Sequence, residues 1–167
     1  MANSEDNLNA AFAGESQANQ RYLRFGKKAQ EDGLAMIGRL FRAVAAAETV
    51  HAQNHLDAMR GVADTLANLR VAMAGEAEEF KSMYPAFVAA AREEGHKDAE
   101  RTFDYALKVE EIHHGLYAGA VESLEKGEDL PEKKMFVCRG CGNTVEDEAP
   151  DKCPICGAPK SWFMWIE

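Results

Sequence analysis

Four cysteines near the C-terminal end of the chain have the spacing of a metal-binding site. They form two C-x-x-C pairs, Cys138 with Cys141 and Cys153 with Cys156. Such pairs present four thiolates to one tetrahedral ion. A glycine follows each pair, at Gly142 and Gly157, and permits the tight turn in which backbone N–H groups point at the sulfurs. Zinc and iron both accept four sulfur ligands, so the spacing does not choose between a structural zinc site and an iron site that carries one electron.

Glutamate and histidine recur at helical spacing in the earlier part of the chain. The motif E-x-x-H occurs at Glu48–His51 and again at Glu110–His113. Residues three apart lie on one face of a helix, about one turn from each other, so both side chains can reach one ion. Other segments of helical composition add three carboxylates, Glu15, Glu76 and Glu79.

Both E-x-x-H motifs continue apolar stripes with steps of three and four residues. Ile37, Leu40 and Val44 lead to the first motif, and Phe103 and Leu107 lead to the second. An ionised carboxylate within such a stripe is costly unless it is paired or bound to a cation. Carboxylate oxygens with imidazole nitrogens suit iron or manganese. Ferritin-like di-metal proteins use one Glu from each of two helices and a Glu-x-x-His from each of the other two, and this chain offers that set.

Glycines divide the region that carries these motifs into four predicted helices. We predict them from about Ser4 to Gln30, Leu34 to Arg60, Asp64 to Glu94, and His96 or Lys97 to Glu125. Gly61 is expected to cap the second helix and Asp64 to cap the third. Pro85 is expected to kink or end the third helix, because proline removes a backbone donor. Four helices of this length with short connections predict an all-α, ferritin-like four-helix bundle.

The composition changes after Lys126, where a charged stretch with glycine and proline is typical of a linker. We therefore divide the chain into a helical bundle at residues 1–127, a linker at 128–133 and a small domain at 134–167. About 34 residues cannot bury enough core to fold unaided, so the small domain needs a metal. Its aromatic residues are expected to pack around the site as a small core: Phe136, Trp162, Phe163 and Trp165.

The overall composition excludes several classes of protein. Lys and Arg number 19 and Asp and Glu 28, for a formal charge of −9. This charge disfavours nucleic acid and anionic membranes as partners. The longest strongly apolar stretch, at 85–91, is too short to span a bilayer, and the N-terminal sequence MANSEDN has no export signal. The sequence therefore predicts a cytoplasmic protein, in which reduced cysteines hold a metal instead of forming disulfides.

Together these motifs resemble the rubrerythrin family over nearly the whole chain. The matching segments are GES around Glu15, ETVHAQNH at 48–55, GEAEEFKSMYP at 75–85, EEIHH at 110–114, and the rubredoxin-like CRGCG and CPICG. The resemblance implies a di-iron four-helix bundle and a rubredoxin-like domain with one iron in the four-cysteine site, where zinc can replace iron in recombinant protein. It also implies a non-haem peroxidase that reduces hydrogen peroxide to water. Electrons would come from NAD(P)H through rubredoxin or a rubredoxin reductase and enter at the iron of the four-cysteine site.

The resemblance also assigns the metal ligands. It implies that seven side chains bind the iron pair: Glu15, Glu48, His51, Glu76, Glu79, Glu110 and His113. Glu48 and Glu110 would bridge both irons. Glu76 and His113 would hold one of them.

The other iron would exchange one ligand when its redox state changes. Glu15 would hold it in both states, with Glu79 in the diferric state and His51 in the diferrous state, because a more highly charged pair prefers a carboxylate. Tyr22 and Tyr84 match tyrosines that hydrogen-bond to the ligand carboxylates. These four groups, His51, Glu79 and the two tyrosines, are the candidate catalytic residues.

Three other functions remain open at this point. The bundle could be a ferroxidase that oxidises Fe(II) with oxygen or peroxide, or a subunit of an iron-storage shell. It could also be a simple metal-binding module with a zinc ribbon as its tail. The rubredoxin-like tail favours the peroxidase over storage, because a shell needs no dedicated entry for electrons.

The segment between the second and third predicted helices is short for a bundle made by one chain. Those helices run parallel in ferritin-like bundles, so the chain must return the length of the bundle between them. From Glu48 to Glu76 is 28 residues. At about 1.5 Å per helical residue and about 3.3 Å per extended residue, the return needs about 9 non-helical residues, yet residues 63–69 have a helical sequence. We therefore predict a homodimer in which the first two helices of one chain pack with the last two of the other, with the small domain against its partner's bundle.

Overall fold

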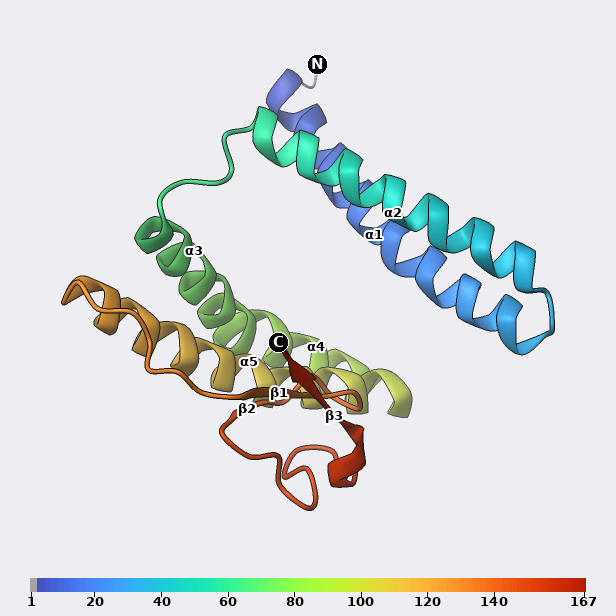
Figure 1. Cartoon of the computed structure of the whole chain (residues 1–167). Coiled ribbons are helices and arrows are strands. Elements are labelled where there is room, and N and C mark those ends of the chain that lie inside the picture. The colour runs from blue at the N-terminus through green and yellow to red at the C-terminus, as the bar shows by residue number, and fades with distance from the viewer. Residues whose placement is uncertain (1–2) are drawn as a thin grey trace. The chain divides into compact units, whose positions relative to one another are not determined.

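The structure, a computed structural model, describes residues 3–167 as two compact units divided between Ala63 and Asp64. Figure 1 shows helices along most of the chain and a small sheet at its C-terminal end. This confirms the predicted class, mostly helical with a small C-terminal metal-binding domain. Within the described residues, no helix has both the length and the apolar character needed to cross a membrane.

The first unit is a helical hairpin of α1 (Ser4–Glu31) and α2 (Ala35–Ala58). Asn3 begins α1 with a capping box: its side chain accepts from the Asp6 N–H at 2.9 Å, and its own N–H donates to the Asp6 carboxylate at 3.2 Å. The two helices approach closely at Gly26 and Gly38, since a Cβ on Gly38 would lie 2.9 Å from the Gly26 carbonyl oxygen. Both predicted helices are confirmed, with ends that differ by two residues or fewer.

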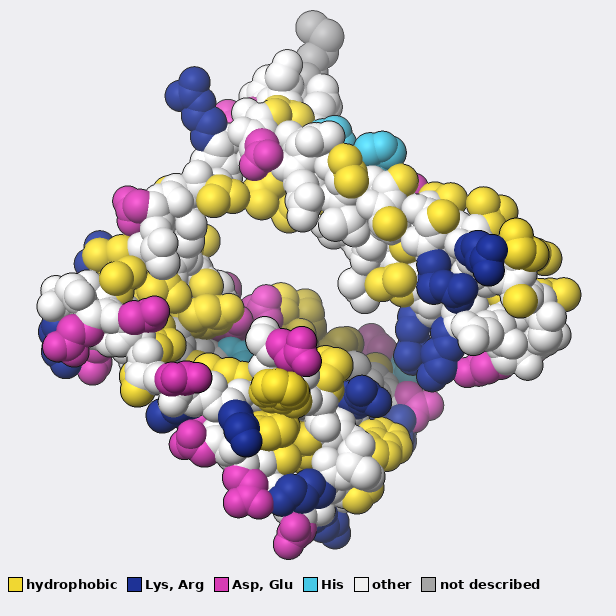
Figure 2. Space-filling view, viewed as in Figure 1, with side chains coloured by type: hydrophobic (Ala, Val, Ile, Leu, Met, Phe, Trp, Pro, Cys, Tyr) yellow, Lys and Arg dark blue, Asp and Glu magenta, His cyan; other side chains and the backbone are white. Residues whose placement is uncertain are grey.

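Many large apolar side chains of this hairpin are exposed. Its buried residues are all small: Gly26, Ala29, Gly38, Ala45 and Ala52. Its exposed apolar residues are Leu23, Phe25, Leu34, Met36, Ile37, Leu40, Val44 and Val50. Figure 2 shows hydrophobic side chains gathered over α2. An apolar surface of this kind is typical of a face that packs against another protein surface.

The prediction that Gly61 caps α2 is confirmed in part, since the Gly61 N–H donates to the carbonyl oxygen of Leu56 at 2.9 Å. The residue in the left-handed conformation is Arg60, with a φ of 53°. A side chain at Gly61 would also be crowded by the backbone, because a Cβ there would lie 3.2 Å from the Leu56 carbonyl oxygen. Residues 59–64 separate α2 from the next helix.

The third predicted helix consists of three parts: α3 (Thr65–Glu78), the π-helical turn η1 (Glu79–Met83) and α4 (Tyr84–Glu93). Asp64 caps α3 as predicted, and its side chain accepts from the Ala67 N–H at 2.9 Å. Pro85 lies in the first turn of α4, where its missing N–H is tolerated. The predicted interruption at Pro85 therefore takes the form of a π turn just before it.

The fourth predicted helix is confirmed as α5 (Lys97–Glu125). His96 caps it, with Nδ1 accepting from the Ala99 N–H at 3.3 Å. Three aromatic rings pack α4 against α5, with centroids 5.4 to 6.3 Å apart: Tyr84, Phe87 and Phe103. This packing fixes α5, which carries two of the candidate ligands of the second unit.

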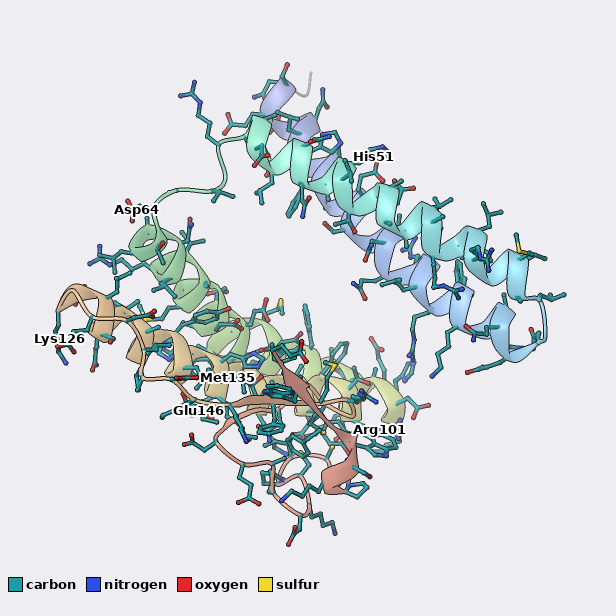
Figure 3. The ribbon with its side chains drawn as sticks, in the orientation of Figure 1. His51, Asp64, Arg101, Lys126, Met135 and Glu146 are labelled. Carbon is teal, nitrogen blue, oxygen red and sulfur yellow. The ribbon has the colours of Figure 1, made fainter. Side chains whose placement is uncertain are left out.

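The C-terminal sheet is antiparallel, with strand order β2–β1–β3. Its strands are β1 (Met135–Cys138), β2 (Thr144–Glu146) and β3 (Phe163–Ile166), and a 3-10 turn, η2 (Lys160–Trp162), leads into β3. Met135 pairs with Glu146 on one side and with Ile166 on the other. Both residues of the first pair are labelled in Figure 3.

The prediction that the aromatic residues of the tail form its small core is wrong in part. Trp162 is 51% exposed and Trp165 is 54% exposed. The residues that are buried there are Cys138, Asn143, Ala149 and Cys153. The interior of the small domain is therefore made mainly of the metal site itself, as expected for a domain too small for a core of its own.

Candidate metal centres

The four cysteine thiols of the tail converge on one point. Sγ of Cys138 lies 3.7 Å from Sγ of Cys156, and Sγ of Cys141 lies 3.6 Å from Sγ of Cys153. A tetrahedron with metal–sulfur bonds of about 2.3 Å has edges of about 3.8 Å, whereas bonded disulfide sulfurs are about 2.05 Å apart. The spacing therefore fits a tetrahedral ion, and the predicted four-cysteine site is confirmed.

Each of these sulfurs accepts a hydrogen bond from the backbone N–H two residues further along the chain. The donor and acceptor pairs are Gly140–Cys138, Asn143–Cys141, Ile155–Cys153 and Ala158–Cys156. Gly142 and Gly157 have φ values of 87° and 77°, in the left-handed region that favours glycine. The two glycines therefore shape the turns that aim N–H groups at the sulfurs, as the sequence predicts.

The protein tunes these thiols differently. Burial raises the pKa of Cys141 and also that of Cys156. Burial acts on Cys153 too, but the N–H groups of Cys156 and Ile155 bring the pKa of Cys153 down to about 7. The backbone N–H groups therefore favour the thiolate form of Cys153, which is the form that binds a metal.

Asn143 is a further contact of the four-cysteine site, and the sequence analysis missed it. It is 1% exposed and donates through Nδ2 to Sγ of Cys153 at 3.7 Å. Its Oδ1 has no hydrogen-bond partner among residues 3–167. An asparagine after a C-x-x-C-G segment has no spacing signature, so nothing in the sequence distinguishes it.

In the helical hairpin, Glu15 of α1 meets Glu48 and His51 of α2. Nδ1 of His51 lies 2.8 Å from Oε2 of Glu48 and 3.8 Å from Oε1 of Glu15. Asn19 ties the two helices together next to this group, donating through Nδ2 to the Ala45 carbonyl at 2.7 Å. The His51 side chain is 53% exposed and is labelled in Figure 3. Glu15, Glu48 and His51 form the first candidate ligand group.

In the second unit, Glu76 of α3 meets Glu110 and His113 of α5. Nδ1 of His113 lies 2.7 Å from Oε2 of Glu110. Burial raises the pKa of Glu76, and the neighbouring Glu110 raises it further. Adjacent carboxylates in a partly buried place repel each other unless a cation lies with them. The donor set of two carboxylates and one imidazole fits iron.

Glu79 and Tyr84 lie at the margin of this second group. The pKa of Glu79 is raised by burial and then by the charge of Glu76. The pKa of Tyr84 is raised by burial and then by the charges of Glu79, Glu110 and Glu76. The Tyr84 hydroxyl is therefore within electrostatic reach of all three carboxylates, and it holds its proton at neutral pH.

The structure brings six of the seven predicted iron ligands into two groups of three, and Glu79 lies outside both. Tyr22 belongs to the hairpin, where its ring centroid lies 6.3 Å from that of Phe25 and 6.2 Å from that of Phe41. Its predicted hydrogen bond to a ligand carboxylate stays a prediction.

The small domain lies against α5 of its own chain. Nε2 of His113 is 2.9 Å from Oγ1 of Thr144 at the start of β2. A Cβ on Gly142 would lie 3.7 Å from Cγ1 of Val109, a residue of α5 that is 2% exposed. These contacts differ from the prediction that the domain packs against its partner's bundle. Contacts between a loop and a helix that are distant in sequence leave no periodic pattern, so Thr144 could not be found beforehand.

Comparisons with known proteins agree with both kinds of site. The family model described as Rubrerythrin matches residues 6–121, and the one described as Rubrerythrin, rubredoxin-like domain matches residues 136–164. The chain is 39% identical to rubrerythrin-2 of Clostridium acetobutylicum, over 95% of this chain and 94% of that protein. It is 35% identical to rubrerythrin of Nitratidesulfovibrio vulgaris, over 95% of this chain and 92% of that protein.

A solved structure also resembles this one. Nigerythrin in its fully reduced, all-ferrous state aligns with a TM-score of 0.57 and 33% identity, over 99% of this chain and 88% of that chain. Rubrerythrins are di-iron oxidoreductases of the response to oxidative stress, and they carry a rubredoxin-like domain. With both family models matched and both donor sets in place, this chain belongs to the rubrerythrin family.

Proposed function

We propose that this protein is a non-haem di-iron peroxidase that reduces hydrogen peroxide to water. The balanced reaction takes one hydrogen peroxide, two electrons and two protons to two molecules of water. The observation that supports this best is the hydrogen bond between His113 and Thr144. It connects the second carboxylate–histidine group to the four-cysteine domain, and neither storage nor simple ferroxidase activity needs such a connection.

The donor atoms divide as the proposed activity requires. Glu15 and Glu48 of the first group and Glu76, Glu110 and His113 of the second would hold the two irons. The four cysteines hold the third iron, since an all-sulfur set suits a one-electron site. When bound, the irons supply the electrons that break the O–O bond.

The protein's own side chains supply the protons. The raised pKa of Tyr84 keeps the proton on its hydroxyl at neutral pH, next to the carboxylates. The raised pKa of Glu79 favours a protonated carboxyl group whenever that group is not bound to a cation. We propose that these two groups give protons to the oxygens of the substrate as the O–O bond breaks.

Glu79 and His51 would act as alternative ligands of one iron in its two redox states. Glu79 is the first residue of the π turn η1, and π turns in helices are frequent at functional sites. His51 is half exposed and its only close partners among the described residues are carboxylates of its own group. An exposed side chain such as that of His51 suits a ligand that binds and leaves.

We also propose a cytoplasmic homodimer with exchanged helix pairs. Residues 59–64 are fewer than the about 9 non-helical residues that a return within one chain needs. The exposed apolar face of the hairpin gives it a surface to bury against a second chain.

The functional domains are a bundle at 1–127, a linker at 128–133 and a rubredoxin-like domain at 134–167. Rubredoxin or an NAD(P)H-dependent rubredoxin reductase delivers the electrons.

The test uses full-length, iron-loaded protein, reduced without oxygen and then given one equivalent of hydrogen peroxide. We expect this equivalent to be consumed, and a second equivalent to bring back the full red spectrum of the ferric four-cysteine site, because three reduced irons hold three electrons and each peroxide takes two. Added rubredoxin reductase with NADH should make the reaction continuous. The control is protein with zinc in the four-cysteine site, which should lose the continuous reaction. Rapid oxidation of added Fe(II) by oxygen, without consumption of peroxide, would identify a ferroxidase instead.

A further inference from the structure

His113 makes two polar contacts, one from each ring nitrogen. Nδ1 lies 2.7 Å from Oε2 of Glu110, and Nε2 lies 2.9 Å from Oγ1 of Thr144. The Thr144 hydroxyl makes a second contact, 3.1 Å from the carbonyl oxygen of Gly142. A histidine, a hydroxyl and a backbone carbonyl therefore form a chain from α5 to the loop of the four-cysteine site.

The direction of these hydrogen bonds follows from the groups at their ends. The Gly142 carbonyl can only accept, so the single hydroxyl proton of Thr144 is donated to it. The hydroxyl oxygen then accepts from His113, which places the imidazole proton on Nε2. This leaves the lone pair of a neutral imidazole on Nδ1, where it faces the Glu110 carboxylate. The Nδ1 lone pair and the carboxylate oxygen both carry electron pairs and lie 2.7 Å apart. Such a pair of atoms is stabilised when both bind the same cation.

Packing holds Thr144 in place for this contact. Thr144 pairs with Val137 in the β1–β2 register, so its backbone is fixed by the sheet. The neighbouring loop rests on α5, where a Cβ on Gly142 would be in van der Waals contact with Val109. The hydroxyl is thus presented to the histidine by two rigid elements and not by a flexible loop.

We propose that Thr144 is a positioning residue for the second ligand group. Its hydroxyl fixes the His113 ring with Nδ1 toward the metal, and so makes affinity at the carboxylate–histidine site depend on the docked four-cysteine domain. This inference rests on the proposed function in one respect, that His113 is a metal ligand. It adds that metal binding at the carboxylate–histidine site depends on the four-cysteine domain, to which it is already joined by the chain.

The test titrates Co(II) into the metal-free full-length protein and follows both sites, because sulfur-rich and oxygen-rich sites give different visible spectra. Affinity at the carboxylate–histidine site is scored after the four-cysteine site has filled and the tail has folded. For Thr144→Val and Thr144→Ala we expect the half-saturating Co(II) concentration of the carboxylate–histidine site to rise about 10- to 100-fold. Thr144→Ser keeps the hydroxyl and should bind as the wild type does. The spectrum of cobalt in the four-cysteine site should be the same in the wild type and all three variants, which shows that the tail is folded.

Unchanged affinity in the valine and alanine variants would overturn the proposal, and so would an equal loss in the serine variant. A second measurement needs no variant: in zinc-loaded wild-type protein with nitrogen-labelled histidine, the Nε2 proton of His113 should exchange slowly with water. Fast exchange of that proton would also overturn it. Neither readout involves peroxide, so a wild type that binds metal but does not consume peroxide would remove the proposed function and leave this inference standing.

Discussion

The backbone N–H of Tyr84 donates to the carbonyl oxygen of Glu79, five residues earlier, and this bond closes the π turn η1. The two side chains interact as well, because the charge of Glu79 is the largest contribution after burial to the raised pKa of Tyr84. The turn therefore joins the carboxylate that we propose to exchange as a ligand with the hydroxyl that we propose to hold a proton. Pro85 follows directly and favours a helix that starts again at that point.

Tyr84→Phe removes this hydroxyl and keeps the ring that packs on Phe87 and Phe103. We expect peroxide turnover to fall about 100-fold, the usual scale for losing a general acid, while iron content and thermal stability change little. Stopped-flow measurement of peroxide consumption checks this. Tyr105→Phe is the control, because it makes the same chemical change on α5. Equal turnover in the two variants would exclude Tyr84 as a proton donor.

The sequence was sufficient to predict the metal sites because their spacing is local. C-x-x-C and E-x-x-H are satisfied within one turn or one helical face, so Cys138 with Cys141, or Glu110 with His113, can be recognised without knowing the fold. Helix ends were also predictable where one residue decides them, as Asp64 does for α3. The family resemblance extended these local signals to the whole ligand set.

The features that could not be predicted depend on contacts between distant segments or on competition between local effects. Thr144 reaches His113 only because the loop of the four-cysteine site rests on α5. Asn143 is buried by the metal site and not by any apolar pattern. The π turn at 79–83 forms where the helix continues although Pro85 lacks a backbone donor. Helix propensities of single residues do not show whether a helix at such a point ends, kinks or forms a π turn.

His51→Ala tests the exchangeable ligand. We expect the variant to bind iron in the oxidised state much as the wild type does, because Glu79 then takes the place of the histidine. Reductive turnover of peroxide should fall about 10- to 100-fold. Iron analysis and rapid-mixing kinetics with reduced protein give the two values. His55→Ala, one turn further along α2, is the matched control, and wild-type turnover in His51→Ala would rule out the exchange.

Asn143→Leu tests the hydrogen bond from Nδ2 to Sγ of Cys153. Its loss leaves more negative charge on the sulfur and favours the ferric form of a bound iron. The reduction potential of the iron in the four-cysteine site should therefore fall, by on the order of tens of millivolts. Redox titration of the visible spectrum measures this, and Ser161→Ala on the surface of the tail is the control. A potential equal to the wild type would show that the side-chain amide does not tune the site.

The raised pKa values of Glu76 and Glu79 predict how pH acts on the metal-free protein. Because both values lie above the ordinary 4.5, the folded state keeps protons that the unfolded chain has lost. The stability that these groups contribute is fully present below pH 4.5 and is lost as the pH rises through the raised values. Thermal melts should show the metal-free protein losing Tm over this range. Zinc-loaded protein should not show that loss, since the cation replaces the protons.

Glu76→Gln separates this effect from other titrations. The variant should lose part of the downward slope of Tm with pH in the metal-free state, whereas Glu78→Gln, two residues away, should keep it. Identical slopes in wild type and Glu76→Gln would mean that repulsion at this group does not limit the stability of the metal-free fold.

Exchange of helix pairs between chains can be tested with two inactive variants. Glu48→Gln damages the group on the hairpin, and Glu110→Gln damages the group on α3 and α5. In an exchanged heterodimer both defects fall in one bundle and the other bundle is intact, whereas without exchange every bundle carries one defect. Random pairing of co-expressed variants should therefore restore about a quarter of wild-type peroxide turnover. If tagged, co-purified heterodimers show no recovery, the helix pairs are not exchanged. Inserting about six flexible residues after Gly61 provides the matched control, because a longer return removes the need for exchange and should abolish the recovery.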